Sequence, residues 1–194
     1  MCGHSADVRP IRSNASAPKV ILVGQAPGRV ESAGGMPFAG RAGKTLFRWL
    51  ERAGIDERTA RRWIYIAAVT RCYPGPHAGG RGDRVPSLEE QDACSTWLTA
   101  EFKLIRPSLV IPVGQLAIGR FLPRVPLAQL IGRAHTIVHA GGQSVAIPLP
   151  HPSGASSWIH QSGHAQLLQS ALDLLAVELR HLQPHGQPER QGVA

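Results

Sequence analysis

The sequence lacks any apolar run approaching the roughly 20 residues that a membrane-spanning helix requires, so we expect neither a transmembrane segment nor a membrane partner. Residues 1–14 are polar and lack the apolar core of a secretory signal. The chain has only three cysteines, too few for a disulfide scaffold. We therefore expect a reducing, cytoplasmic setting.

Acidic residues are scarce: 13 Asp and Glu stand against 21 Lys and Arg, which gives a formal net charge of +8. This balance favours a polyanionic partner, although a few exposed arginines would give the same count. With 43% hydrophobic and 18% charged residues, the 194-residue chain is too apolar for intrinsic disorder. We expect a monomer with one domain, residues 19–183, between an irregular segment (1–18) and a flexible tail (184–194).

Short apolar runs alternate with helical patterns along the whole domain. The predicted strands are residues 19–24, 63–70, 108–114 and 145–149. The last is expected at a sheet edge, because Pro148 cannot donate a ladder hydrogen bond. The predicted helices are residues 43–54, a helix capped by Ser87, residues 115–122, and a C-terminal helix with a leucine stripe. The alternation predicts a three-layer α/β/α sandwich around a mainly parallel, four-stranded sheet.

Three unusual loops follow predicted strands, at residues 24–43, 69–75 and 149–154. Open α/β sheets bind ligands beyond the carboxyl ends of their strands, so we expect the site there. The run Gly43-Lys44-Thr45 resembles the end of a phosphate-binding P-loop. That motif needs a glycine five positions before Gly43, where this chain has Phe38. A nucleotide-handling α/β protein is therefore disfavoured.

Several motifs occur in order along the chain: Gly24-Gln-Ala-Pro-Gly28; Gly35-Met-Pro-Phe38 with Gly40-Arg-Ala-Gly43; Cys72; Pro86-Ser-Leu-Glu-Glu90; Cys94; Ile105-Arg-Pro107; Val113-Gly114; and His151-Pro-Ser153. Together they resemble the uracil-DNA glycosylase superfamily, most closely the iron–sulfur group called family 4. The resemblance implies excision of uracil or a related deaminated base from DNA during base excision repair. No nucleophilic lysine lies in the motifs, so no lyase step is expected.

The resemblance implies roles for five residues. A glycosylase flips a base into a pocket, stacks it, and stabilises the negative charge that it carries away. Phe38 matches the stacking residue, and His151 matches the histidine that donates to the base O2. Gln25, where family 4 usually has Glu, and Ala26 would contact the base. Glu31 is a candidate for activating water or stabilising the cationic sugar. The structural alternatives are a core Phe, a surface His and a solvated Glu.

Ala68 departs from the family 4 pattern, which has Asn at this position to pair with uracil. Alanine cannot read a base edge, and the related family 5 enzymes tend to have Ala there. Uracil specificity is therefore in doubt, and Gln25 points the same way. A DNA-binding protein that recognises a lesion or an abasic site without turnover is the alternative function.

Family 4 holds a 4Fe-4S cluster with four cysteines, and Cys2, Cys72 and Cys94 match three of them. The fourth ligand would precede Met1, or be His4, or the cluster is lost and the thiols are simply buried. The segment between Cys72 and Cys94 is also longer than usual and rich in glycine.

Phosphate contacts are expected from Arg41, Lys44, Arg71 and Ser153. A solvated face is expected for Arg58, Arg61 and Arg62. Trp158 could act as a wedge in DNA or begin the last helix, and we favour the helix.

Overall fold

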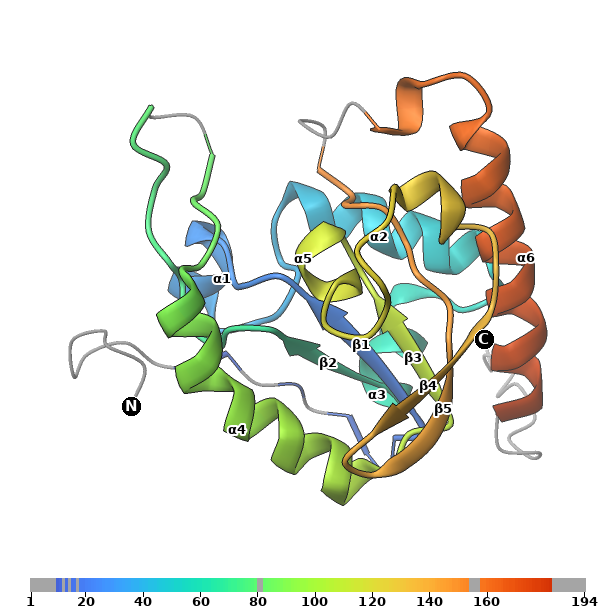
Figure 1. Ribbon diagram of the computed structural model, residues 1–194, viewed down its shortest axis with the longest axis horizontal. Helices are drawn as coiled ribbons and strands as arrows, with labels where there is room; N and C mark the ends of the chain where they lie inside the picture. Colours follow the sequence, from blue (N-terminus) through green and yellow to red (C-terminus); the bar gives the residue numbers. More distant parts are fainter. Residues whose placement is uncertain are drawn as a thin grey trace, which may run out of the picture.

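The computed structural model describes residues 10–182, apart from positions 12, 14, 17, 80–81 and 154–157. Within them a five-stranded sheet forms the centre of the molecule, in the order β2-β1-β3-β5-β4 (Figure 1). The strands are β1 (Val20–Gly24), β2 (Ile64–Ala68), β3 (Leu109–Pro112), β4 (His135–His139) and β5 (Gly142–Ala146). All neighbouring strands pair in parallel except β4 and β5, which are antiparallel.

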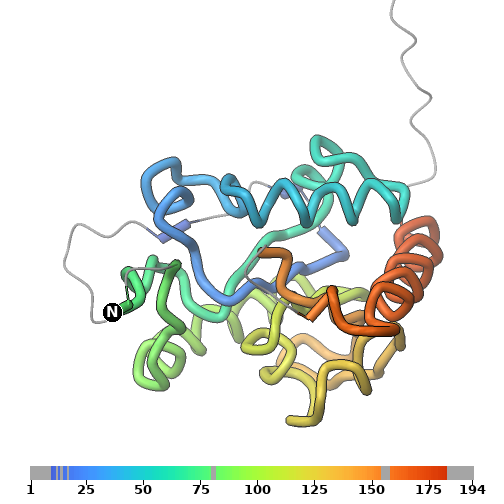
Figure 2. Tube along the Cα trace, turned by 90° about the horizontal axis from the view of Figure 1, so that it is seen from above, coloured from blue at the N-terminus to red at the C-terminus, as the bar shows by residue number. Residues whose placement is uncertain are grey.

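Helices cover both faces of the sheet, which confirms the three-layer α/β/α architecture. They are α1 (Arg29–Gly34), α2 (Arg41–Arg52), α3 (Glu57–Trp63), α4 (Leu88–Ile105), α5 (Gln115–Ile118) and α6 (His164–Leu182), with 3-10 turns η1 (Leu127–Gln129) and η2 (Trp158–His160). Helices α2, α3 and α6 pack in one hydrophobic cluster, and α4 and α5 in the other. Figure 2 shows α2 and α4 on opposite sides of the sheet. No helix in the described part of the chain is long and apolar enough to cross a membrane.

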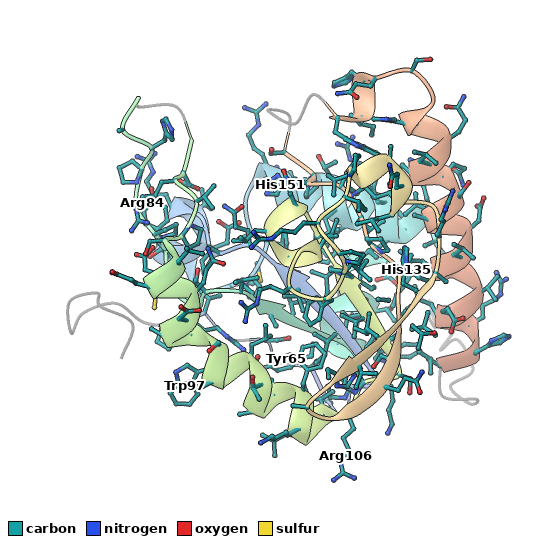
Figure 3. All side chains as sticks on the ribbon, viewed as in Figure 1. Tyr65, Arg84, Trp97, Arg106, His135 and His151 are labelled. Atoms are coloured by element: carbon teal, nitrogen blue, oxygen red, sulfur yellow. The ribbon has the colours of Figure 1, made fainter. Side chains whose placement is uncertain are left out.

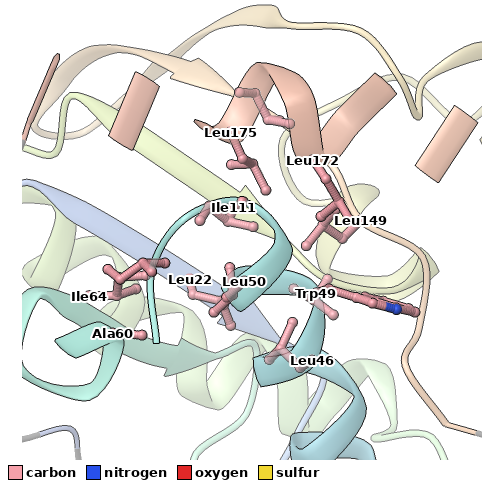
Figure 4. Close-up of a cluster of buried hydrophobic side chains, with 14 of the residues drawn as sticks. Leu22, Leu46, Trp49, Leu50, Ala60, Ile64, Ile111, Leu149, Leu172 and Leu175 are labelled. Carbon is pink, nitrogen blue, oxygen red and sulfur yellow. The ribbon is translucent and has the colours of Figure 1, made fainter. Parts of the chain in front are cut away.

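The central strands β1 and β3 are buried along their whole length, as expected for apolar runs covered on both faces. Alternate side chains of β1 enter the two clusters: Leu22 joins the first, and Ile21 and Val23 join the second. Figure 4 shows Leu22 and Ile111 of the sheet close to Leu50 of α2, with Leu172 of α6 in the same cluster. Burying such an aliphatic side chain stabilises the fold by about 1.5–3 kcal/mol.

The predicted edge position of the last parallel strand is wrong. Strand β5 lies between β3 and β4, and the edge is β4, which the sequence analysis did not predict. Burial alternates along it, with Ile137 buried and Thr136 and Val138 exposed, but the exposed Val138 hides this alternation in the sequence. Pro148 causes no conflict because β5 ends before it, at Ala146.

Other element boundaries differ by a few residues. Trp63 ends α3 rather than starting a strand, and α5 is shorter than predicted. The predicted capping box is confirmed. The Ser87 hydroxyl accepts a hydrogen bond from Glu90 N–H, and the Glu90 carboxylate accepts one from Ser87 N–H.

Candidate functional site

The candidate site lies where the strand order reverses. From β1, the chain adds β2 on one side and β3 on the other, which makes the carboxyl ends of β1 and β3 a topological switch point. The register places Gly24 opposite Ala68, and Val23 opposite Pro112. The segment after β5 reaches the same edge, because Gly114 N–H donates to Leu149 C=O. Three loops from distant parts of the sequence therefore meet here.

Phe38 lies against the end of β1. A Cβ placed on Gly24 would be 3.0 Å from Phe38 Cζ. The Phe38 ring therefore lies directly on the backbone of Gly24, and any residue with a side chain at position 24 would collide with the ring. The Phe38 backbone is left-handed, with φ of 52°. Its side chain is half-buried and also packs on the hydrophobic core. The ring therefore belongs partly to the core, and the residue remains partly accessible.

His151 lies against the end of β3 in the same way. A Cβ on Gly114 would be 3.0 Å from His151 Cδ2, and Figure 3 shows His151 on this side of the sheet. Ser153 N–H donates to His151 Nδ1 at 3.3 Å, and the Ser153 hydroxyl lies 2.9 Å from the same nitrogen. Since an N–H can only donate, Nδ1 is an acceptor and the neutral ring carries its proton on Nε2. Burial lowers the pKa of His151, which favours this neutral form.

Ala68 and Gln25 lie at the same edge of the sheet, at the ends of β2 and β1. Ala68, half-buried at the end of β2, presents a methyl group and no hydrogen-bonding atom. Gln25 follows β1 and lines a groove of about 730 Å³, whose wall also includes Gln91, Gln115 and Arg120. The backbone C=O of Gln25 accepts a hydrogen bond from Thr70 N–H, which connects the first loop to the second.

Glu31 braces the first loop. Its Oε2 accepts a hydrogen bond from Gly28 N–H at 3.1 Å, and its Oε1 accepts one from Gly40 N–H at 2.9 Å. The carboxylate therefore joins the N-terminal ends of α1 and α2. Each carboxylate oxygen has a second lone pair, so this contact leaves acceptor capacity on Glu31.

Arg71 does not fit the predicted phosphate contact. It is 8% exposed and forms an ion pair with Glu101, which also accepts a hydrogen bond of 2.6 Å from Tyr65 O–H. The charge is therefore satisfied inside the protein, between the sheet and α4. Arg41 and Lys44 of α2 are exposed, as a phosphate contact requires.

The loop before α6 is partly described. Ser153 is engaged with His151 through both its backbone N–H and its hydroxyl. Trp158 begins the short turn η2 and stacks on His164 of α6, with 4.1 Å between ring centroids. Trp158 therefore packs against the start of α6. It begins the turn η2 that precedes α6, whereas we expected it to begin the helix itself.

Two of the three predicted metal ligands are visible. Cys72 after β2 and Cys94 in α4 are buried, whereas Cys2 and His4 lie outside the described residues. Among the described residues, no group of three or more His, Cys, Asp or Glu side chains could hold a metal ion. Two thiolates do not make the four-ligand set of a cubane cluster, so the described residues alone do not fit one.

The glycine-rich insertion after Cys72 folds into a hairpin, drawn in green at the upper left of Figure 1. His77 N–H donates to Gly82 C=O, and Arg84 N–H donates to Gly75 C=O. Asp83 reaches the first loop, because a Cβ on Gly28 would be 2.9 Å from Asp83 Oδ2. Desolvation and a hydrogen bond with Asp83 raise the pKa of Tyr73. The contacts of Asp83 with the first loop and with Tyr73 were not predicted, because no motif in the sequence links these positions.

Fold and site together define an α/β/α protein with a candidate ligand site at the switch point of an open sheet. Residues 10–175 match the Uracil DNA glycosylase superfamily, to which the chain therefore belongs. It is 34% identical over 135 residues to a type-4 uracil-DNA glycosylase of Thermotoga maritima, an alignment that covers 70% of this chain and 65% of the relative. It is 29% identical over 141 residues to the type-4 enzyme of Archaeoglobus fulgidus, with the same coverage.

A type-5 uracil-DNA glycosylase of Pyrobaculum aerophilum is also similar, with 28% identity over 146 residues, 70% of this chain and 61% of that protein. These matches confirm the predicted superfamily. They also confirm that the chain resembles type-4 enzymes, with some likeness to type 5. The chain spans about 65% of the length of the type-4 relatives from Thermotoga and Archaeoglobus.

Proposed function

We propose that this protein is a monofunctional DNA glycosylase that removes uracil or a related deaminated base in base excision repair. The observation that carries the proposal is the neutral, Nε2-protonated His151 at the end of β3, next to strand β1, whose end is covered by Phe38. An enzyme that expels a base as an anion needs a preorganised donor and a stacking surface in one crevice. The superfamily membership and the names of its type-4 relatives support the same activity.

In the proposed reaction, the flipped base enters the crevice and stacks on the exposed part of Phe38. His151 Nε2–H donates to the base O2 as negative charge develops there, because Nδ1 is occupied by Ser153. The sugar gains cationic character, which the Glu31 carboxylate stabilises directly or through an oriented water. Gln25 can orient a water or hold the base, but its neutral amide cannot accept the proton that the attacking water loses.

Base selection follows from Ala68. Its methyl group supplies no hydrogen bond to the Watson–Crick edge, so the pocket does not distinguish uracil by an amide at this position. Hypoxanthine and xanthine, which are also deamination products, are therefore proposed substrates beside uracil.

DNA is the proposed partner, with phosphates held by Arg41, Lys44 and Ser153. The formal net charge of +8 and the exposure of both basic residues support this assignment. An iron–sulfur cluster on Cys2, Cys72, Cys94 and one further ligand stays a prediction, and no step of the proposed reaction passes through it. We also propose that the protein acts as a monomer.

The decisive experiment incubates the protein with oligonucleotides that contain uracil, hypoxanthine or xanthine and scores alkali-labile breaks. Abasic sites that exceed the enzyme concentration support turnover. Strand breaks without alkali would contradict the absence of a lyase step. Tight binding to lesion DNA with no abasic product would favour the alternative, a lesion-binding protein, for which the neutral Gln25 and Ala68 are the motive.

A further inference from the structure

Arg61 of α3 does not lie on the solvated face that the sequence pattern predicts for Arg58, Arg61 and Arg62. Its side chain is 20% exposed, whereas Arg58 and Arg62 are exposed. The guanidinium reaches back to the loop between α1 and α2. That loop carries Phe38, the proposed stacking residue.

The guanidinium of Arg61 donates hydrogen bonds to the loop and also lies over an aromatic ring. Nη1 donates to Pro37 C=O at 2.8 Å, and Nη2 donates to Phe38 C=O at 3.3 Å. The Arg61 Cζ atom lies over the Phe47 ring, 4.3 Å from its centroid. Glu57, one turn earlier on α3, accepts a hydrogen bond of 2.9 Å from Nε. Arg61 is thus held by α2 and α3 while it binds two consecutive carbonyls.

One of the two carbonyls belongs to a residue with a strained backbone. Phe38 has a left-handed φ of 52°, which non-glycine residues adopt rarely. Its carbonyl also points at the first turn of α2, since a Cβ on Gly43 would be 1.8 Å from Phe38 O. This conformation aims the Phe38 ring at Gly24 and therefore needs support from surrounding contacts.

The loop is held by two charged side chains. Glu31 accepts a hydrogen bond from Gly40 N–H, two residues after Phe38, and Arg61 donates to the carbonyls of Pro37 and of Phe38 itself. A charged guanidinium forms stronger hydrogen bonds than a neutral donor, and its planar fork spans two acceptors. Lysine, with a point charge on a flexible stem, cannot reproduce this geometry.

We propose that Arg61 is a positioning residue of the base pocket, which holds the Phe38 backbone in the conformation that presents the ring to a flipped base. The inference rests on the proposed function, because Phe38 is the stacking surface only if a base enters the crevice. Arg61 touches neither the base nor the sugar in this scheme. Arg61 acts only through Phe38, so its replacement should affect excision only when Phe38 is present.

The test compares Arg61→Ala and Arg61→Lys with Arg58→Ala, which removes the same charge from an exposed position of the same helix. Single-turnover excision of uracil is measured at saturating enzyme, well below each melting temperature. We expect Arg61→Ala to lower the rate at least tenfold, Arg61→Lys to rescue it only in part, and Arg58→Ala to leave it unchanged. In a Phe38→Ala background, Arg61→Ala should change the rate less than twofold. Equal effects in both backgrounds would overturn the proposal.

Amide hydrogen exchange separates this proposal from the proposed function. In Arg61→Ala, the hydrogen-bonded amides of Gly40 and Lys44, which donate to Glu31 and to Gly40 C=O, should exchange faster than in wild type, with no change in Arg58→Ala, whether or not any base is excised. Unchanged exchange would overturn the positioning role even in an active enzyme. Faster exchange in a protein that excises none of the three bases would leave Arg61 as a loop clamp and refute the glycosylase proposal alone.

Discussion

His151 Nδ1 accepts a hydrogen bond from the backbone N–H of Ser153, two residues further along the chain. This contact fixes the ring orientation and leaves the proton of the neutral imidazole on Nε2. The adjacent Gly114 allows the ring to lie on the end of β3. The histidine is thus oriented before any ligand arrives, as an electrostatic catalyst requires.

Replacement of this histidine should impair chemistry more than binding. His151→Ala removes a donor that acts on charge present mainly in the transition state, so the single-turnover rate should fall by on the order of a hundredfold or more. Affinity for uracil-containing DNA should change much less. His160→Ala, at an exposed position of η2, is the control. Wild-type excision by His151→Ala would mean that another loop carries the reaction.

The pH dependence should reflect the lowered pKa of His151, which burial shifts below the ordinary value of 6.5. The folded state then favours the neutral ring, so its contribution to stability is present above pH 6.5 and is lost as pH falls through the folded pKa. Single-turnover excision should likewise stay flat above pH 6.5 and decline only at lower pH. Titration of the imidazole by NMR checks the assignment, and a folded pKa above 6.5 would contradict it.

The substitution Ala68→Asn should narrow the base range. Asn supplies an amide that can read a base edge where Ala68 has only a methyl group, and Ala68 is half-buried at the end of β2, at the switch-point edge of the sheet. We expect excision of uracil to be retained and the ratio of uracil to hypoxanthine excision to rise about tenfold, as for one well-placed hydrogen bond. A variant whose ratio equals that of wild type would exclude Ala68 as a determinant of specificity.

Binding to DNA should weaken steeply with salt, because neutralised phosphates release counterions. The double variant Arg41→Ala/Lys44→Ala should lower the slope of log affinity against log salt by about 2. Lys103→Ala/Arg180→Ala, which removes two exposed charges from the last turns of α4 and α6, should leave the slope unchanged. Equal slopes for both double variants would remove Arg41 and Lys44 from the interface.

Iron content tests the predicted cluster. Protein purified anaerobically should contain iron and acid-labile sulfide, and Cys72→Ala should lose both, because a cubane cluster needs its thiolate ligands. Ser95→Ala, next to Cys94 on α4, is the matched control and should retain them. Iron-free, colourless wild-type protein would show that Cys72 and Cys94 serve only the fold.

The sequence by itself determined the parts of this protein that depend on local chemistry. Apolar runs such as residues 20–24 must be buried strands, and the Ser87 and Glu90 pair caps α4 through contacts within a single turn. Loops after the parallel strands meet at one edge in any such sheet, so the positions of Phe38 and His151 were predictable.

Only the tertiary structure decided which polar groups meet across long stretches of chain. Arg71 lies inside because Glu101 on α4 neutralises it, and Arg61 supports Phe38 because α3 packs beside the first loop. The edge strand β4 likewise forms because β5 offers it a pairing partner. These contacts depend on the packing of whole elements, whose relative positions no local pattern of residues specifies.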